Sequence, residues 1–181
     1  MVERLATFHE FFQSNQNKRL LAVYGGAGSG KSVATAQHIV YLLLTQPDIR
    51  ILIIRKTLPA LRITAYRLIL DILYQMQVPF YLNKSELVIR FNNSEILFKG
   101  LDDPEKIKSY EANYVWCEEA TEITREDFLQ LNLRMRRANA ATNQMFLSFN
   151  PIDQYHWLIA DIVQGNREDV AIHHSTYKDN I

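Results

Sequence analysis

The stretch Gly25-Gly26-Ala27-Gly28-Ser29-Gly30-Lys31-Ser32 fits the pattern G-x-x-x-x-G-K-[ST] of a phosphate-binding loop. The apolar residues 20–24 before it are typical of a buried strand, and residues 32–44 after it have the length and apolar spacing of a packed helix. Strand, glycine-rich turn and helix, in this order, are the context in which the motif binds phosphate. The sequence therefore predicts a site for a nucleoside triphosphate at this turn.

The residue types of the loop suit that chemistry. Glycine allows the backbone to wrap closely around an anion, and the backbone N–H groups from Gly26 to Ser32 attract phosphate together with the positive end of the helix dipole. Lys31 is expected to reach the β- and γ-phosphates, and the hydroxyl of Ser32 to ligate Mg²⁺. The alternative is a glycine-rich turn that binds nothing. The candidate nucleotide-binding residues of the loop are Gly25, Gly26, Ala27, Gly28, Ser29, Gly30, Lys31 and Ser32.

Composition limits the remaining possibilities. The 181 residues suffice for a single α/β domain, and 20 basic against 20 acidic residues give the chain no general basic character for nucleic acid. No apolar run approaches the length of a membrane span, and the N-terminus lacks the apolar segment of a signal peptide. The single cysteine, Cys117, excludes an internal disulfide, and the five histidines lack zinc-ligand spacing. These features predict a soluble, intracellular domain covering residues 1–181.

The rest of the chain alternates between strand and helix patterns. Apolar runs predict further core strands of a parallel sheet at 49–55, 114–119, 144–149 and about 170–174. Helical patterns lie at 3–14, from Pro59 to about Met76, within 100–108, at 125–137 and at 155–163. Residues 86–91 and 95–99 predict a β-hairpin, and Asn83-Lys84-Ser85-Glu86 predicts a turn. The predicted fold class is α/β, with a mainly parallel central sheet flanked by helices and a β-hairpin insertion.

Two consecutive carboxylates, Glu118 and Glu119, end the apolar run Tyr114-Val115-Trp116-Cys117. Adjacent side chains of a strand point to opposite sides, so the pair can take two roles at one γ-phosphate. Glu118 is expected to hold Mg²⁺, directly or through water, and Glu119 to polarise the attacking water. The alternative is an acidic helix start, because Glu is common in a first helical turn.

Two further polar groups are candidates for the reaction. Arg134, Arg136 and Arg137 end a predicted helix. Three interpretations are open: the arginines interact favourably with the helix dipole, one of them is an arginine finger in this or a neighbouring subunit, or they contact DNA phosphate. Asn150 follows a core strand, at an edge of a nucleotide-binding sheet that faces the phosphates. It either senses the γ-phosphate or forms a simple Asn-Pro turn with Pro151.

Taken together, these residues resemble the N-terminal ATPase domain of the large terminase subunit of tailed bacteriophages, the motor that packages DNA into a procapsid. The resemblance covers nearly the whole chain. It is carried by GGAGSGKS, IIRKTLPALRITAY, FKGLDDPEKIKS, VWCEEATEI, LRMRR, SFNP and STYKDN, in this order.

The resemblance implies a P-loop NTPase of the RecA-like, additional-strand catalytic-glutamate type that uses ATP and Mg²⁺. It places Lys31 and Ser32 in the phosphate loop, Glu118 in the metal position, Glu119 in the catalytic position and Ser148-Phe149-Asn150 in the coupling motif. The implied partners are double-stranded DNA, the portal protein, a small terminase subunit and other large-terminase subunits in a ring. The implied location is the cytoplasm of the host cell, with no membrane contact.

The chain departs from that family in two respects. Many relatives carry an arginine inside the phosphate loop, where this chain has Gly26 and Ala27, so the positive charge is expected from the cluster 134–137 or from a neighbouring subunit. Relatives also continue into a nuclease domain with clustered acidic residues. We therefore expect these residues to form an excised domain that is monomeric in isolation and has no DNA-cutting activity.

Two other functions compete with DNA packaging. A helicase or recombinase ATPase shares the fold and the hydrolysis, but needs further nucleic-acid motifs and usually a second core domain. A small-molecule kinase of this fold places a phosphate acceptor and has no use for a water-activating glutamate such as Glu119. Release of phosphate without an acceptor separates the kinase from the other two functions, and dependence on procapsids separates packaging from strand separation.

Overall fold

The structure is a computed structural model of the chain. It describes residues 6–102, 107, 109–138, 142–150, 153–176 and 178.

The described strands form one eight-stranded sheet in the order β3-β4-β5-β2-β6-β7-β1-β8. All neighbours from β5 to β8 are parallel, whereas β4 runs antiparallel to β3 and β5. The strands are β1 (Leu20–Gly25), β2 (Arg50–Arg55), β3 (Tyr81–Asn83), β4 (Val88–Phe91), β5 (Ser94–Gly100), β6 (Tyr114–Glu118), β7 (Gln144–Phe149) and β8 (Val170–Ser175). The predicted α/β class, with its hairpin of β4 and β5, is confirmed.

Strand β7 lies between the two chemically important strands. It pairs on one side with β1, which leads into the phosphate loop, and on the other side with β6, which ends in Glu118. The register sets Ser148 opposite both Val23 and Glu118, so the carboxyl ends of the three strands meet at one edge of the sheet. This inserted strand is the feature expected of the additional-strand type of P-loop fold.

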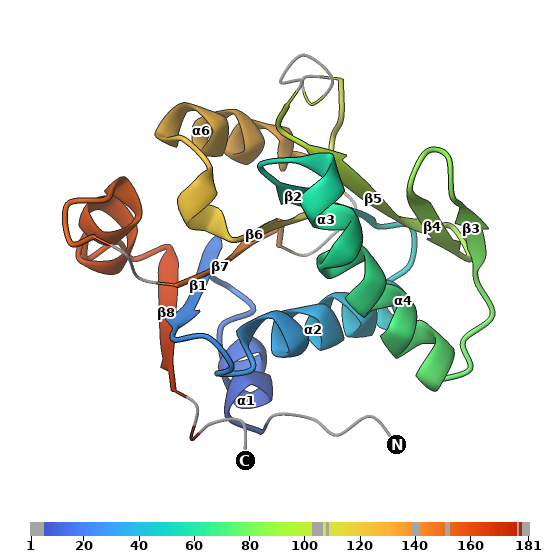
Figure 1. Ribbon diagram of the computed structural model, residues 1–181, viewed down its shortest axis with the longest axis horizontal. Helices are drawn as coiled ribbons and strands as arrows, with labels where there is room; N and C mark the ends of the chain where they lie inside the picture. The colour runs from blue at the N-terminus through green and yellow to red at the C-terminus, as the bar shows by residue number, and fades with distance from the viewer. Residues whose placement is uncertain are drawn as a thin grey trace.

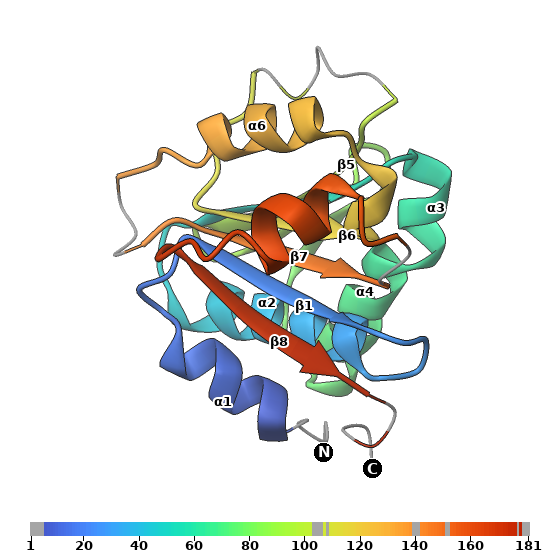
Figure 2. The same ribbon diagram turned by 90° about the vertical axis from the view of Figure 1, so that its left-hand side faces the viewer.

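Helices cover both faces of the sheet (Figures 1 and 2). One face carries α1 (Ala6–Ser14), α2 (Lys31–Thr45), α3 (Leu58–Ile63) and α4 (Ala65–Gln75). The other face carries the 3₁₀ turn η1 (Ala120–Glu122), α6 (Arg125–Arg134) and the π-helical η2 (Leu158–Val163). None of the helices in the described part of the chain is long and apolar enough to cross a membrane.

Strand alternation divides the buried side chains between two cores. In β1, Leu21 and Val23 pack toward α2, whereas Leu20 and Ala22 pack toward α6 and η2. In β6, Tyr114 and Trp116 face the α2 side and Cys117 faces the α6 side. Burial on both faces explains why these strands read as continuous apolar runs. The same alternation sends Glu118 to the face that α2, α3 and α4 cover.

The structure corrects several predicted element boundaries. The single helix expected from Pro59 to about Met76 is broken at Thr64, whose φ of −115° and ψ of −103° are not helical. Helix α6 ends at Arg134 instead of residue 137, and η2 begins at Leu158 instead of residue 155. Strand β3 was not predicted, because its three residues are too few to give an alternation pattern.

Two predicted helices reach beyond the described residues. The one expected at 3–14 is described from Ala6 onward. Most of the short helix expected within 100–108 lies at positions that the structure does not describe. The turn predicted at 83–86 is present, with the Asn83 side chain accepting hydrogen bonds from the backbone of Ser85 and Glu86.

Candidate functional site

The phosphate loop joins the end of β1 to the start of α2 and needs glycine at specific places. A Cβ atom at Gly25 would overlap the carbonyl oxygen of Ser175 in β8, whereas a Cβ at Gly26 would meet no atom within 4 Å. Gly30 caps α2 with a left-handed φ of 85°, which residues with a Cβ rarely adopt. Gly26, Ala27 and Gly28 are exposed, so the outer side of the loop is accessible.

Lys31 is the first residue of α2, and its side chain folds back over the loop. Its Nζ donates to the carbonyl oxygens of Gly25 at 3.0 Å and Gly26 at 2.9 Å. It also lies 2.9 Å from Oδ1 of Asn150 and 3.3 Å from Oγ of Ser29. Burial lowers the pKa of Lys31, and the negative charge of Glu119 partly offsets this effect. Lys31 therefore links the phosphate loop by hydrogen bonds to the residue that follows β7, and the negative charge of Glu119 acts on its ammonium group.

A buried pair of serines ties the loop to the outermost parallel strand. Ser29 is fully buried, and its Oγ lies 2.9 Å from Oγ of Ser175 at the end of β8. Ser175 in turn donates to the carbonyl oxygen of Tyr24 at 3.3 Å. Ser32, the predicted Mg²⁺ ligand of the loop, is half-buried in the first turn of α2.

Glu118 is the last residue of β6, and only 4% of its surface is exposed. Its Oε2 accepts a hydrogen bond from Oγ1 of Thr64 at 2.5 Å and lies 4.0 Å from Nη1 of Arg55. Burial raises the pKa of Glu118, although the bond from Thr64 and the charge of Arg55 act in the opposite direction. The carboxylate is thus held in one orientation by residues of β2 and of the α3–α4 break.

Glu119 differs from its neighbour in backbone and in contacts. Its φ of 49° and ψ of 55° are left-handed, which is uncommon for a residue other than glycine. Within the described part of the chain, its carboxylate accepts no hydrogen bond, but its charge acts on both Lys31 and Arg55. Strained conformations of this kind cluster at functional sites. Glu119 also immediately precedes η1, so the alternative of an acidic helix start describes its position but not that of Glu118.

The arginine cluster lies at the opposite edge of the sheet. The carbonyl oxygen of Arg134 accepts from Ala112, just before β6, and Arg136 pairs with Glu111 at 2.6 Å. Arg137 Nη2 lies 3.2 Å from the carbonyl oxygen of Asp48, just before β2. The five residues of β6 alone separate the two edges by about 13 Å, at roughly 3.3 Å per residue. Within one chain, the cluster is therefore not brought to Lys31.

Sequence reasoning missed three residues that contact the predicted site: Arg55, Thr64 and Ser175. Asn150 was selected because it follows a core strand at the edge of the sheet that faces the phosphates. Arg55 ends β2 at the same edge, so the same reasoning could have selected it. Its Nε and Nη2 each lie 3.2 Å from a carboxylate oxygen of Glu122, which anchors the guanidinium beside Glu118. Thr64 and Ser175 contact the site only through tertiary packing, and no local pattern indicates them.

The residues at this edge fit a magnesium-bound nucleoside triphosphate. The loop offers backbone N–H groups and a lysine to phosphate, and the hydroxyl of Ser32 and the carboxylate of Glu118 are hard oxygen ligands. Among the described residues, no group of three or more His, Cys, Asp or Glu side chains is placed to hold a metal by itself. Mg²⁺ is usually bound by one or two protein oxygens together with substrate phosphates, so this donor set matches it.

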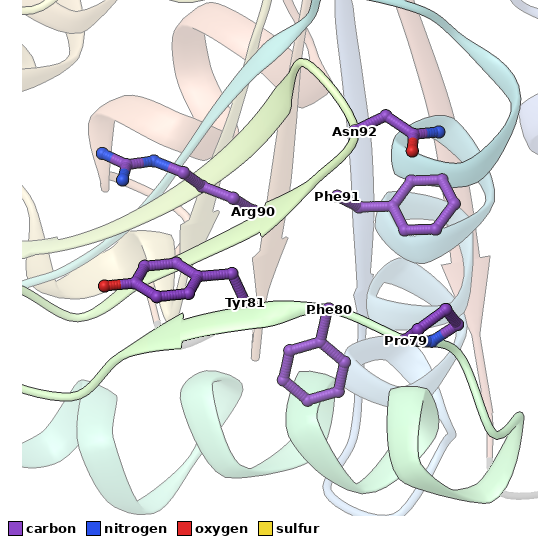
Figure 3. Close-up of a pocket in the computed structure, with 6 residues that line it drawn as sticks. All are labelled: Pro79, Phe80, Tyr81, Arg90, Phe91 and Asn92. Atoms are coloured by element: carbon purple, nitrogen blue, oxygen red, sulfur yellow. The ribbon is translucent and has the colours of Figure 1, made fainter.

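A separate shallow pocket lies at β3 and β4, where β3 is the outermost strand of the sheet (Figure 3). It is lined by Pro79, Phe80, Tyr81, Arg90, Phe91 and Asn92. The guanidinium of Arg90 in β4 lies 5.9 Å from the ring centre of Tyr81 in β3, and Phe80 points toward α4, where its ring contacts Tyr74. None of the predicted nucleotide-binding residues lines this pocket.

Comparison with known proteins identifies the family. A family model described as "Phage terminase large subunit" matches residues 17–181. The chain is 28% identical over 204 residues to the PBSX phage terminase large subunit of Bacillus subtilis strain 168, covering 100% of this chain and 47% of that protein. It is 26% identical over 171 residues to the large terminase subunit of Bacillus phage SPP1, covering 86% of this chain and 40% of that protein.

A solved structure supports the same assignment at the level of the fold. The large terminase of a thermophilic bacteriophage, solved in complex with ATP-gamma-S, superposes with a TM-score of 0.80 and 17% identity, over 98% of this chain and 45% of that one. The chain thus spans about half the length of the relatives that it matches. On the family match, with the fold in agreement, the chain belongs to the phage terminase large subunit family.

Proposed function

We propose that this chain binds Mg·ATP in the phosphate loop and hydrolyses it, and that the hydrolysis drives double-stranded viral DNA into a procapsid. The observation that carries the proposal is the hydrogen bond between Lys31 and Asn150, which joins the loop to the strand beside the acidic pair. Family membership and the likeness to a terminase solved with ATP-gamma-S support it.

In this proposal the phosphate loop binds the triphosphate, Glu118 holds the metal and Glu119 activates the attacking water. Backbone N–H groups of residues 25–32 and the ammonium of Lys31 bind the phosphates, and Ser32 and Glu118 hold Mg²⁺. The metal, when bound, neutralises charge that develops on the phosphate oxygens. Glu119 accepts a hydrogen bond from the attacking water and aligns it with the γ-phosphorus. Its carboxylate suits this role because, among the described residues, no hydrogen bond holds it elsewhere.

The arginine finger and the coupling residue complete the proposal. Because Arg134, Arg136 and Arg137 lie at the far edge of the sheet, an arginine of this cluster acts on the nucleotide of a neighbouring subunit. Asn150 relays the loss of the γ-phosphate, since it binds the same Nζ that binds phosphate. Arg55 is not proposed as the finger, because Glu122 already binds it with two hydrogen bonds.

The wider setting is also part of the proposal. Residues 1–181 form the ATPase domain, which works in the host-cell cytoplasm in a ring of large-terminase subunits. That ring contacts double-stranded DNA, the portal protein and a small terminase subunit. The isolated domain is monomeric.

The test is steady-state phosphate release from Mg·ATP, without a phosphate acceptor, over a range of protein concentrations and with or without double-stranded DNA. Lys31→Ala is expected to weaken ATP binding at least about tenfold, because a charge-assisted hydrogen bond contributes about 1.5–3 kcal/mol. Lys84→Ala is the matched control, since Lys84 is exposed in the turn before β4. Release that needs an added acceptor would contradict the proposal in favour of a kinase. Strand separation by the domain would favour a helicase.

A further inference from the structure

Glu118 has a second structural task besides the metal role proposed for it. Burial raises the pKa of its carboxyl group, and the backbone N–H of Ala65, the first residue of α4, is among the groups that act in the opposite direction. The first N–H groups of a helix have no partner within the helix and need a cap. Thr64, the residue before α4, supplies no such cap from its own side chain. The negative charge of Glu118 on β6 therefore acts on the start of a helix whose preceding residue, Thr64, is 54 positions away in sequence and is bonded to it.

The hydroxyl of Thr64 holds this carboxylate in place. Its Oγ1 lies 2.5 Å from Oε2 of Glu118 and 2.9 Å from the carbonyl oxygen of Ala60 in α3. A hydroxyl has a single proton to donate, so these two acceptors compete for it. Nη1 of Arg55 donates to the same Oγ1 at 3.2 Å, which leaves the hydroxyl proton free to point at one of the two acceptors.

The position of Thr64 makes this contact conformationally important. Thr64 lies at the break between α3 and α4, where the backbone leaves the helical region. A proton donated to Ala60 stabilises the end of α3, whereas a proton donated to Glu118 ties the break to the end of β6. Any change in the orientation of Glu118 therefore alters the hydrogen bonding at the break.

We propose that Thr64 is the positioning residue of Glu118, and that Glu118 couples occupancy of the nucleotide site to the N-terminus of α4. This inference rests on the proposed function, since it requires that Glu118 face Mg²⁺. One carboxylate oxygen serves Thr64, which leaves the other to the metal or to a water that the metal binds. With a divalent cation bound, the negative charge of the Glu118 carboxylate would be partly neutralised, so it would stabilise the first turn of α4 less.

The first test uses the wild-type protein. Amide hydrogen exchange is measured with ATP-gamma-S in EDTA and then with ATP-gamma-S and Mg²⁺. We expect exchange in the first turn of α4 to become at least threefold faster when Mg²⁺ is added, while the last turns of the same helix keep their rate. Unchanged or slower exchange in the first turn would overturn the coupling.

The second test separates positioning from general destabilisation. Thr64→Val is expected to need at least tenfold more Mg²⁺ for half-maximal binding of ATP-gamma-S, whereas Thr64→Ser keeps the wild-type requirement within twofold. Thr57→Val is the matched control, because the Thr57 hydroxyl caps α3 through Ala60 and is not among the contacts of Glu118. Thr64→Ala gives the same readout if the valine variant does not fold.

The outcomes distinguish this inference from the function on which it rests. A wild-type protein that does not bind ATP-gamma-S at any Mg²⁺ concentration would overturn both. Normal binding together with an unchanged Mg²⁺ requirement in Thr64→Val or Thr64→Ala would overturn the positioning role alone.

Discussion

Nζ of Lys31 lies 2.9 Å from Oδ1 of Asn150, so a single hydrogen bond joins the start of α2 to the end of β7. The two residues are 119 positions apart in sequence, and the sheet order brings them together by inserting β7 beside β1. The bond predicts how the loop responds to a change of charge at position 150.

Asn150→Asp should weaken binding of ATP about tenfold or more. The new carboxylate would form an ion pair with Lys31 and repel the triphosphate, and hydrogen bonds to charged groups contribute about 1.5–3 kcal/mol. Asn150→Ala is the control: it leaves Nζ with its acceptors on Gly25, Gly26 and Ser29, so binding should change less than threefold. Titration with a fluorescent ATP analogue measures both, and equal affinities for the two variants would contradict this account.

Gly25→Ala should destabilise the domain by about 2 kcal/mol or more. The added methyl group would overlap the carbonyl oxygen of Ser175, and neither backbone can move without disturbing β1 or β8. Gly26→Ala should change the free energy of unfolding by less than about 1 kcal/mol, because its Cβ would point into open space. Urea denaturation followed by circular dichroism compares the two. An equal loss of unfolding free energy in the two variants would show that Gly25 does not need this close approach to Ser175.

His38 should make the domain less stable in acid. Burial lowers the pKa of His38 from 6.5 to about 3, and the charge of His9 adds to this effect. Below pH 6.5 the imidazole of His38 becomes protonated in the unfolded chain but stays neutral in the folded chain. The free energy of unfolding therefore falls between pH 6.5 and 3, by about 1.4 kcal/mol per pH unit at most.

His38→Phe tests this contribution while keeping a ring stacked on Phe12, whose ring centre lies 4.4 Å from that of His38. Its unfolding free energy should run parallel to that of the wild type above pH 7 and fall less steeply below pH 6.5. Denaturation curves at a series of pH values give the difference. Parallel curves over the whole range would show that His38 is not held neutral.

The position of the arginine cluster predicts complementation between subunits. Alanine at Arg136 or Arg137 removes an ion pair with an exposed partner and should cost at most about 1 kcal/mol of unfolding free energy.

If one arginine of 134, 136 and 137 acts on the nucleotide of a neighbouring subunit, its alanine variant mixed with Glu119→Gln should release phosphate faster than either protein alone. Phosphate release from equimolar mixtures measures this. Full activity of all three alanine variants by themselves would remove the cluster from the reaction.

The sequence predicted which core strands end in candidate functional residues, but it did not predict which side chains contact one another at those strand ends. The phosphate loop, Glu118 and Asn150 each follow an apolar run, and because parallel strands end at one edge, the structure brings these segments together. The family resemblance is likewise confirmed by the family match. The roles of Lys31, Ser32, Glu118, Glu119 and Asn150 in binding and catalysis remain predictions.

What the sequence could not reveal depends on tertiary contacts. The break at Thr64 falls inside a good helical pattern, and it is bonded to Glu118 on a distant strand. The link between Ser29 and Ser175 likewise forms only when β8 pairs with β1. Arg136 and Arg137 were predicted on a helix, but α6 ends at Arg134, and these two side chains bind Glu111 and Asp48 instead.

In the proposed mechanism, Glu119 activates the water that attacks ATP. Chemical quench under single-turnover conditions, with protein in excess over Mg·ATP, measures this step by itself. Glu119→Gln should bind ATP as the wild type does and convert bound ATP to ADP at least about 100-fold more slowly, in keeping with the loss of a general base. Glu126→Gln, an exposed neighbour in the first turn of α6, should behave as the wild type. Conversion at the wild-type rate by Glu119→Gln would show that this carboxylate does not activate the water.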